Sequence, residues 1–439
     1  MSVENPAPAH DPATTVVGPL GVGERWVALD VVRGLAIFGI LLVNMAGFST
    51  PPQVAELSTP HWTAPLDRAA QWLIHALAQT KFYSLFSFLF GLGMAIQMER
   101  IEARGGRFAP LYVRRLIVLL GFGLFHALLF WSGDVLTIYA VLGLVLLPAR
   151  RWPDRVILPL ALLLHLLPLA YYTPVVVQTE LSRRDPEYNA TITAWLAERD
   201  ADLLQEAEGV VAVYRHGTVA DMFRQRRHEL AANLFDTLAY FVPHVLALFL
   251  LGLYVGRRRV LHGPDAHPVL WRGLAAVGMP IGVLCGAVEA TLAQDAEYIA
   301  SWTTLAAYAL RVVGTPLLAA GYTAVIVLLL TRERWARRLA PLAAVGRMAL
   351  TNYLFQTLVC TTLCYSYGLR WYGRITPAWG LTLTVVIFAL QVPLSVLWLR
   401  HFRFGPLEWL WRSATYLRRQ PFREPRPHGL PPPTQGLTT

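Results

Sequence analysis

The stretch that decides the fold is residues 114–134, RRLIVLLGFGLFHALLFWSGD, in which Arg115 and His126 bracket ten apolar residues ahead of an acidic turn. An apolar run of this length predicts a membrane-spanning helix, because about 20 such residues cross the hydrocarbon core. Eleven steps at 3.6 residues per turn return the two side chains to nearly one helix face, about 16 Å apart along the axis. Ionisable groups are costly in a bilayer, so His126 and Asp134 are candidate functional residues.

The rest of the chain has the composition of a membrane protein. Of its 439 residues, 55% are hydrophobic and 15% are charged, and many apolar runs reach spanning length. We predict an all-α, polytopic membrane helix bundle of about ten transmembrane helices. The predicted spans are 29–48, 82–98, 111–131, 135–149, 154–173, 237–256, 270–292, 303–330, 342–367 and 377–400.

Arginine is distributed unevenly among the connections. It is concentrated after the second, fourth, sixth, eighth and tenth spans, whereas the short connections between these contain little of it. Positive charge favours the cytoplasmic side, so this alternation predicts that both termini are cytoplasmic. The net charge of +10 is then explained by membrane topology and does not indicate nucleic-acid binding.

The chain divides into six predicted segments. They are a disordered leader (1–24), an N-terminal transmembrane part (25–173), an external helical module (174–236), a C-terminal transmembrane part (237–403), an interfacial helix (404–420) and a disordered tail (421–439). The external module shows two or three short helical patterns with charged faces, which suit either an acceptor-side lid or a solvated connector. A further amphipathic stretch, residues 66–79, predicts a helix along the outer interface.

Metal chemistry finds no support in the sequence. Cys285, Cys360 and Cys364 lie in apolar stretches without the spacing of metal ligands. The histidines are dispersed, and no zinc-protease motif, phosphate-binding loop or dinucleotide motif is present. We therefore predict no bound metal.

Several motifs carry a resemblance to a known family. They are RWVALDVVRGLAIFGILLVNM (25–45), KFYSLFSFLFGLG (81–93), GDVLTIYAVLG (133–143), GRMALTNYLFQ (346–356) and GPLEWLWR (405–412). In this order they resemble the YeiB-like family of bacterial membrane proteins, DUF418, over about residues 25 to 416. The resemblance implies a multi-pass protein of the bacterial plasma membrane.

That family is similar, more distantly, to the transmembrane acyltransferases, which include the acyltransferase-three enzymes and the lysosomal heparan-glucosaminide acetyltransferase. In the acyltransferase-three pattern an arginine and a histidine eleven residues later handle acyl-CoA, and Arg115 and His126 match it. The pattern's first-span histidine corresponds here to Asn44, eleven residues after Arg33. Asparagine does not titrate at neutral pH but forms hydrogen bonds. The lysosomal enzyme also resembles this chain in carrying asparagine there, and His61 is the loose counterpart of its active histidine.

The resemblance implies acyl transfer from cytoplasmic acyl-CoA to an external acceptor, namely an envelope glycan, a lipid or a small metabolite. Arg115 would bind the phosphates of the donor, since a guanidinium matches phosphate geometry. Other residues expected on the donor side are Arg114, Arg33, Arg347 and Asn352. The oligomeric state and the choice among these acceptors remain open.

On the acceptor side, His126 or His61 would act as the general base. Asp134 would orient the imidazole, and Asn44 would orient an acceptor or a thioester carbonyl. This mechanism requires that Arg115 and His126 line one solvent-filled conduit.

Each residue also has a structural explanation. Arg114 and Arg115 could anchor the helix at the inner membrane face. His126 could be a packed interior histidine, and Asp134 could cap the N-terminus of the next helix. Asp30 and Arg33 suit a local ion pair, and the polar residues of the ninth span, including Asn352, suit contacts between helices. The alternative function is a small-solute transporter or permease, and a third is a structural subunit.

Overall fold

The computed structural model describes residues 27–260, 267–295 and 300–423, and this part of the chain is almost entirely helical, with one isolated bridge between Phe402 and Arg423 in place of any strand. The predicted all-α membrane bundle is confirmed. The predicted leader (1–24) and residues 424–439 of the predicted tail lie outside the described residues. The helices are α1 (Val27–Ser49), η2 (Pro52–Glu56), α2 (Pro65–Leu77), α3 (Lys81–Ala103), α4 (Phe108–Leu129), α5 (Leu136–Ala149), α6 (Asp154–Ser182), α7 (Pro186–His216), α8 (Val219–Ala232), α9 (Leu234–Asp236), η3 (Thr237–Phe241), α10 (Val242–Arg257), α11 (Pro268–Gly273), η4 (Leu274–Gly278), α12 (Met279–Asp295), α13 (Trp302–Leu330), α14 (Glu333–Arg347), α15 (Ala349–Cys364), α16 (Pro377–His401) and α17 (Pro406–Tyr416).

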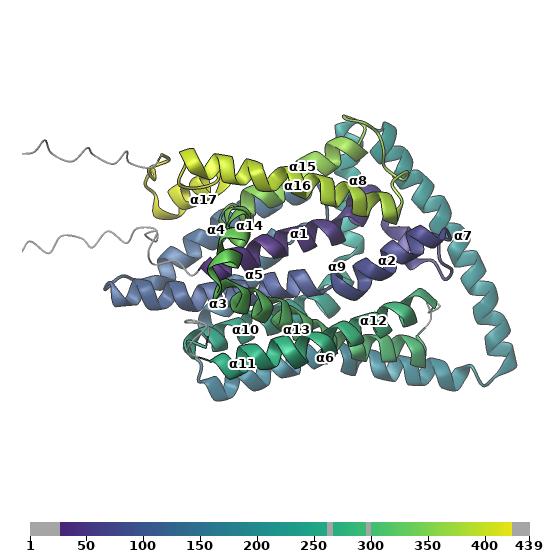
Figure 1. Ribbon diagram of the computed structural model, residues 1–439. Helices are drawn as coiled ribbons and strands as arrows, with labels where there is room; N and C mark the ends of the chain where they lie inside the picture. The colour runs from purple at the N-terminus through teal and green to yellow at the C-terminus, as the bar shows by residue number, and fades with distance from the viewer. Residues whose placement is uncertain (1–26, 261–266, 296–299, 424–439) are drawn as a thin grey trace, which may run out of the picture.

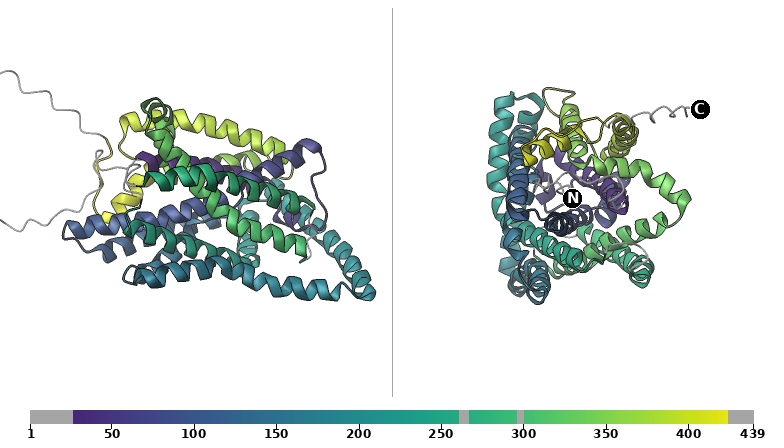
Figure 2. Two further views of the ribbon diagram at one scale, coloured as in Figure 1. Left: turned by 60° about the horizontal axis from the view of Figure 1, so that its bottom comes forward. Right: turned by 90° about the vertical axis from the view of Figure 1, so that its left-hand side faces the viewer.

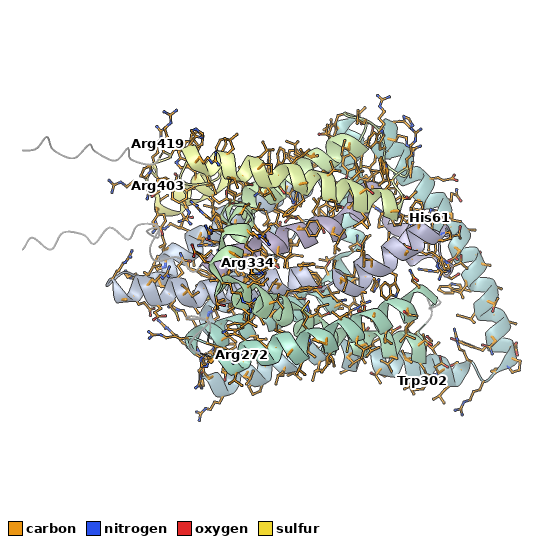
Figure 3. The ribbon with its side chains drawn as sticks, viewed as in Figure 1. His61, Arg272, Trp302, Arg334, Arg403 and Arg419 are labelled. Atoms are coloured by element: carbon orange, nitrogen blue, oxygen red, sulfur yellow. The ribbon has the colours of Figure 1, made fainter. Side chains whose placement is uncertain are left out.

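The long helices run between two ends of the bundle that differ in composition (Figures 1 and 3). Helix α1 begins at one end, beside α14 and α17, and we call this the terminal end. The opposite end is crossed by α7, and we call it the loop end. Figure 3 labels His61 and Trp302 at the loop end, and four arginines in the half that leads to the terminal end: Arg272, Arg334, Arg403 and Arg419.

Eight helical stretches in the described part of the chain are long and apolar enough to cross a membrane, one of them being the continuous α2 and α3. Helices α5 and α15 are shorter, at 14 and 16 residues, but connect the same two ends. The start of α15 bonds to α17 at the terminal end through Leu350 and Glu408, and Tyr365 after its last turn stacks on Tyr214 of α7. The eight long stretches together with α5 and α15 account for about ten crossings.

The stretch 342–367, predicted as one span, is divided between two helices. Helix α14 ends at Arg347 and α15 begins at Ala349. The first backbone N–H groups of a helix lack acceptors within that helix. At the start of α15, Glu408 Oε1 accepts from Leu350 N at 2.7 Å and from Thr351 N at 3.1 Å. Burial raises the pKa of Glu408, while the bonds from Thr351 and Leu350 act in the opposite direction.

Residues 66–79, predicted to lie along the outer interface, form most of α2, which packs against α12 and α16. Trp72 Nε1 donates to Thr291 Oγ1 at 3.0 Å, and the backbone of Ala76 lies directly against Gly286. Helix α2 therefore contributes one face to the bundle interior, which its amphipathic pattern equally allows.

The external module contains longer helices than the sequence predicts. Helix α6 continues to Ser182, and α7 then runs for 31 residues across the loop end (Figures 1 and 2). Asp185 caps the start of α7 by accepting from Glu187 N, and α7 ends at His216, just before Gly217. Thr218 and Asp221 form a capping box that starts α8. The last turns of α7 pack against the α15–α16 connection, where Tyr214 meets Tyr365 and Tyr372.

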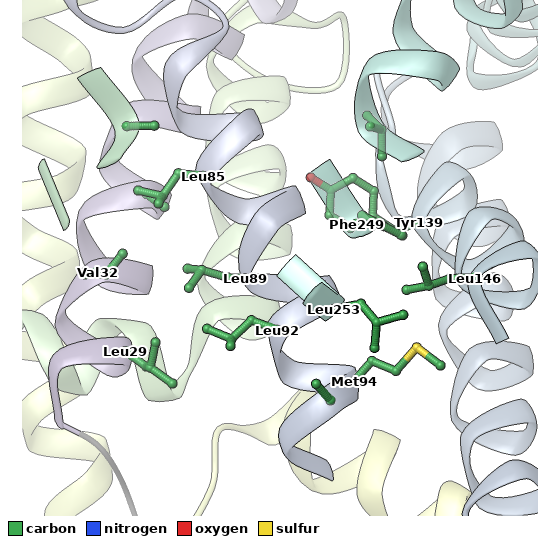
Figure 4. Packing of buried hydrophobic residues seen from close by; sticks show 14 of the residues in the cluster. Leu29, Val32, Leu85, Leu89, Leu92, Met94, Tyr139, Leu146, Phe249 and Leu253 are labelled. Carbon is green, nitrogen blue, oxygen red and sulfur yellow. The ribbon is translucent and has the colours of Figure 1, made fainter. Parts of the chain in front are cut away.

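The largest buried cluster combines residues of α1, α3, α5 and α10 (Figure 4). Leu89 and Leu92 lie on the side of Leu29 and Val32, and Phe249 and Leu253 lie on the side of Tyr139 and Leu146, so the cluster surrounds the contact between α3 and α10. Close approach of these two helices depends on paired glycines, as is common between membrane helices. A Cβ on Gly91 would lie 2.0 Å from the Phe249 carbonyl oxygen, and one on Gly252 would lie 2.1 Å from that of Phe88.

We expect Gly91→Ala to destabilise the protein by about 1–3 kcal/mol, because the added methyl group forces α3 and α10 apart. The matched control is Gly93→Ala, two residues along the same helix, where a Cβ meets no atom within 4 Å. Thermal unfolding of the purified protein in detergent measures both. Equal melting temperatures for the two variants would show that this contact does not limit packing.

Candidate functional site

His126 and Asp134 form a buried pair at the loop end of α4. Nδ1 of His126 lies 2.8 Å from Oδ1 of Asp134, and Nε2 lies 3.0 Å from Oγ1 of Thr357 on α15. The side chains of His126 and Asp134 are each 1% exposed. Both imidazole nitrogens therefore have partners within the protein, and the ring links a carboxylate on one side to a hydroxyl on the other.

The turn between α4 and α5 places Asp134 in this position. Its second oxygen, Oδ2, accepts from Thr137 N at 2.7 Å, so Asp134 also satisfies a free N–H group at the start of α5. Trp131 Nε1 donates to the Gly47 carbonyl oxygen at 3.1 Å and ties the turn to α1. Arg226 of α8 donates to the carbonyl oxygens of Leu128 and Phe130 at the end of α4, where a cation is favourable.

A cavity of about 780 Å³ lies at the loop end, within the size range of small-molecule sites. Its walls come from α4, α6, α10 and α13 inside the bundle and from α7, α8 and α9 at the loop end. Asp134 belongs to the wall, whereas His126 does not. Because the side chain of Asp134 is 1% exposed, its carboxylate lies behind the wall and does not open into the cavity.

Glu229 of α8 forms an acidic part of the same wall. It accepts from the hydroxyl group of Tyr214 at 2.9 and 3.0 Å and from that of Ser132 at 2.6 Å. Burial, reinforced by the adjacent carboxylate, raises the pKa of Tyr214 far above its usual range. The phenol therefore stays protonated and holds Glu229 in place.

Two histidines that the sequence analysis did not select form the opposite wall. His165 of α6 and His244 of α10 have ring centroids 5.2 Å apart. Nε2 of His165 lies 2.9 Å from the Val312 carbonyl oxygen, and since a carbonyl only accepts, Nε2 must carry the hydrogen. With the hydrogen on Nε2, the remaining ring nitrogen Nδ1 is the atom that could accept a proton from a bound group.

A cluster of ionisable side chains adjoins these histidines, and it too was missed. Glu289 of α12 is fully buried between Lys81 at 3.1 Å, Arg311 at 2.7 Å and His75 at 3.0 Å. Lys81 was visible in the sequence as the only lysine of the chain. His165, His244, Glu289 and Arg311 were visible as ionisable residues within predicted spans, which is the signal that selected His126.

The predicted donor-side arginines lie near the terminal end. Arg115 NH1 donates to Gln97 at 3.2 Å, and its guanidinium stacks over Trp411 of α17 at 4.3 Å. Arg33 pairs with Asp30 at 3.0 Å. Arg347 has a buried Nε without a hydrogen-bond partner in the described part of the protein. Arg114 donates only to the Pro110 carbonyl oxygen of its own helix, at 3.4 Å.

Arg115 and His126 do not share a conduit along their helix face. Leu119, one turn above Arg115, is 3% exposed, and the neighbouring Leu116 is fully buried. Phe122, the next residue on this face, packs against the same apolar core. The two groups thus lie in separate packed contacts, and apolar side chains occupy the face between them.

The remaining predicted residues lie apart from the cavity wall. Asn352 is 4% exposed and bonds to Val345 and Ser395 at 3.0 and 3.1 Å, which joins α15 to α14 and α16. Asn44 is half-buried on α1, and His61 is exposed at the loop end, with its ring edge-on to Trp62. In the described ranges, no three His, Cys, Asp or Glu side chains are grouped to hold a metal.

Comparison with known proteins identifies the family. Residues 255–418 match the family described as "Protein of unknown function (DUF418)". The chain is 39% identical over 418 residues to the "Uncharacterized protein YxaH" of Bacillus subtilis (strain 168), over 92% of this chain and 97% of the relative. It is 30% identical over 400 residues to the "Uncharacterized protein YeiB" of Escherichia coli (strain K12), over 89% and 96%. The chain belongs to the DUF418 family.

The YeiB-like resemblance is thereby confirmed over nearly the whole chain. The two relatives cover 92% and 89% of this chain, well beyond the family match at residues 255–418. No solved structure matches the chain. The relation of DUF418 to the transmembrane acyltransferases remains a prediction.

We expect Thr357→Val to destabilise the protein by about 1–3 kcal/mol, because it leaves Nε2 of His126 buried without a partner. The control is Thr362→Val on the same helix, since Thr362 is exposed and bonds only to the Leu358 carbonyl oxygen one turn earlier. Thermal unfolding in detergent compares the two variants. An unchanged melting temperature for Thr357→Val would mean that the Thr357 hydroxyl is not needed to satisfy buried His126.

Proposed function

We propose that this DUF418 protein is a membrane acyltransferase of the bacterial plasma membrane that binds its acceptor in the loop-end cavity. The observation that most supports the proposal is His165, an intramembrane histidine on the cavity wall whose bond to Val312 leaves Nδ1 free to take a proton. An acceptor hydroxyl or amine bound there would lose its proton to Nδ1 as it attacks the acyl carbonyl of the thioester. The C–S bond would then break, and CoA would leave as the thiol by taking the proton from the imidazolium.

His165 replaces His126 as the proposed base. His126 has both nitrogens engaged and is 1% exposed, so it has no contact with a molecule in the cavity. Its proposed role, with Asp134 and Thr357, is to hold the end of α4 against α15 beside the cavity. His61 is exposed outside the cavity wall, which gives it no part in this reaction.

The donor would be acyl-CoA, with its phosphates near the terminal end. Arg115 lies there with its guanidinium over Trp411, and a guanidinium matches the geometry of a phosphate group. Under this proposal the terminal end faces the cytoplasm, in agreement with the arginine pattern of the connections. An acceptor in the loop-end cavity would be supplied from the opposite side.

A second candidate function is transport of a small solute. One observation favours it: apolar side chains fill the α4 face between Arg115 and His126, so a donor held at Arg115 has no polar path to the cavity along that face. A transporter needs the cavity and a change in its access, but no CoA site.

We expect the purified protein to bind CoA, and Arg115→Ala to weaken this binding at least tenfold, because one charge-assisted phosphate contact contributes about 1.5–3 kcal/mol. The control is Arg334→Ala, an exposed arginine of α14. Calorimetric titration with CoA measures the affinity. Absence of CoA binding by the wild type would refute the donor site and leave transport as the better candidate.

We expect His165→Gln to reduce acyl transfer at least 100-fold, because the amide keeps a donor near Val312 but cannot take a proton. The assay follows radiolabelled acetyl-CoA into non-CoA products in vesicles that contain the protein. His401→Gln, an exposed histidine at the end of α16, is the control. Transfer that survives in His165→Gln would exclude His165 as the base.

A further inference from the structure

The cluster around Glu289 carries more positive than negative charge. Glu289 Oε1 accepts from Arg311 Nε and Oε2 from Lys81 Nζ, at 2.7 and 3.1 Å. Lys81 Nζ also donates to the carbonyl oxygen of His75 at 2.9 Å. One carboxylate thus faces two basic side chains, and by formal charge the cluster holds one more positive than negative group.

Arg311 is the member of this cluster that reaches the cavity. Glu289 and Lys81 have fully buried side chains, whereas that of Arg311 is 31% exposed and belongs to the cavity wall. Its Nε is bonded to Glu289 and its NH2 lies 3.3 Å from His75, but its NH1 has no hydrogen-bond partner among the residues that the structure describes. Part of the guanidinium fork therefore remains available to a ligand.

The acidic side chains of the cavity wall do not compensate the positive charge of Arg311. Asp134 is bonded to His126 and Thr137, and Glu229 is bonded to Tyr214 and Ser132. Asp236 lies on α9, whose residues are all exposed, at the outer part of the wall. An uncompensated charge inside a membrane bundle is costly, and a bound anion would remove that cost.

We propose that the loop-end cavity is an anion-binding site in which Arg311 pairs with a carboxylate or phosphate group of the ligand. The proposal rests on the cavity being the acceptor site described above, but it concerns binding and requires no acyl donor. Arg311 and His165 lie together, since His165 bonds to Val312, the residue after Arg311. The acceptor would then carry its anionic group at Arg311 and its reactive hydroxyl or amine near His165.

The test is thermal unfolding of the full chain in nanodiscs of phosphatidylcholine, with succinate or inorganic phosphate added at constant ionic strength, and erythritol as the uncharged comparison. A ligand that binds the folded state raises the melting temperature according to its affinity. We expect both anions, but not erythritol, to stabilise the wild type. Arg311→Gln should weaken the apparent affinity at least tenfold and Arg311→Lys to a lesser extent, because lysine keeps the charge without the fork.

The variants are chosen so that misfolding does not imitate loss of binding. Arg311→Gln leaves Lys81 and Glu289 as a neutral pair, and its melting temperature without ligand reports its folding directly. Arg272→Gln, at an exposed arginine of α11 outside the cavity wall, is the control and should respond to anions like the wild type.

A parallel set of nanodiscs contains phosphatidylglycerol and no added anion. If the melting temperature rises in these discs but not with the soluble anions, and Arg311→Gln abolishes the rise, the ligand group in the site is a lipid phosphate. Equal responses of Arg311→Gln and the wild type, or no response to any anion in either disc, would overturn the proposal. Failure to bind CoA would refute the acyltransferase proposal but would leave this result unchanged.

Discussion

The structure depends on the pairing of polar side chains between helices in a bundle whose surroundings are apolar. Lipid gives helices little hydrophobic reason to associate, so close packing and hydrogen bonds decide which helices meet. His126 joins α4 to α15 through Thr357, and Glu289 joins α12 to α3 and α13 through Lys81 and Arg311. These contacts lie around the loop-end cavity, and they fix the helices that form its walls.

Hydropathy and arginine spacing predict most of this fold because they report directly on the cost of placing each segment in lipid. They do not report on tertiary contacts. The break between α14 and α15 depends on Glu408, a residue about 60 positions later that accepts from Leu350 and Thr351. The last turns of α7 likewise pack against the distant α15–α16 connection, where the ring of Tyr214 lies tilted against those of Tyr365 and Tyr372.

The candidate site shows the same division. His126 and Asp134 are eight residues apart across one turn, so their contact follows from local geometry and could be predicted. The opposite wall combines His165, His244 and Arg311 from three helices that lie far apart in the sequence. Each of these was recognisable as an ionisable residue in an apolar span. Their convergence at one cavity could not be predicted, because helical periodicity shows which residues share a face of one helix but not which other helix packs against that face.

The apolar face between Arg115 and His126 sets the main requirement on any mechanism. Leu116 and Leu119 belong to the buried core, so a chain that links the terminal end to the cavity must pass along other helices or wait for α4 to move. Movement of α4 would strain the contact between His126 and Thr357, which holds it against α15. If the path opens by movement of α4, acyl transfer and transport would both require a change at this contact, and they would differ in what crosses once it opens.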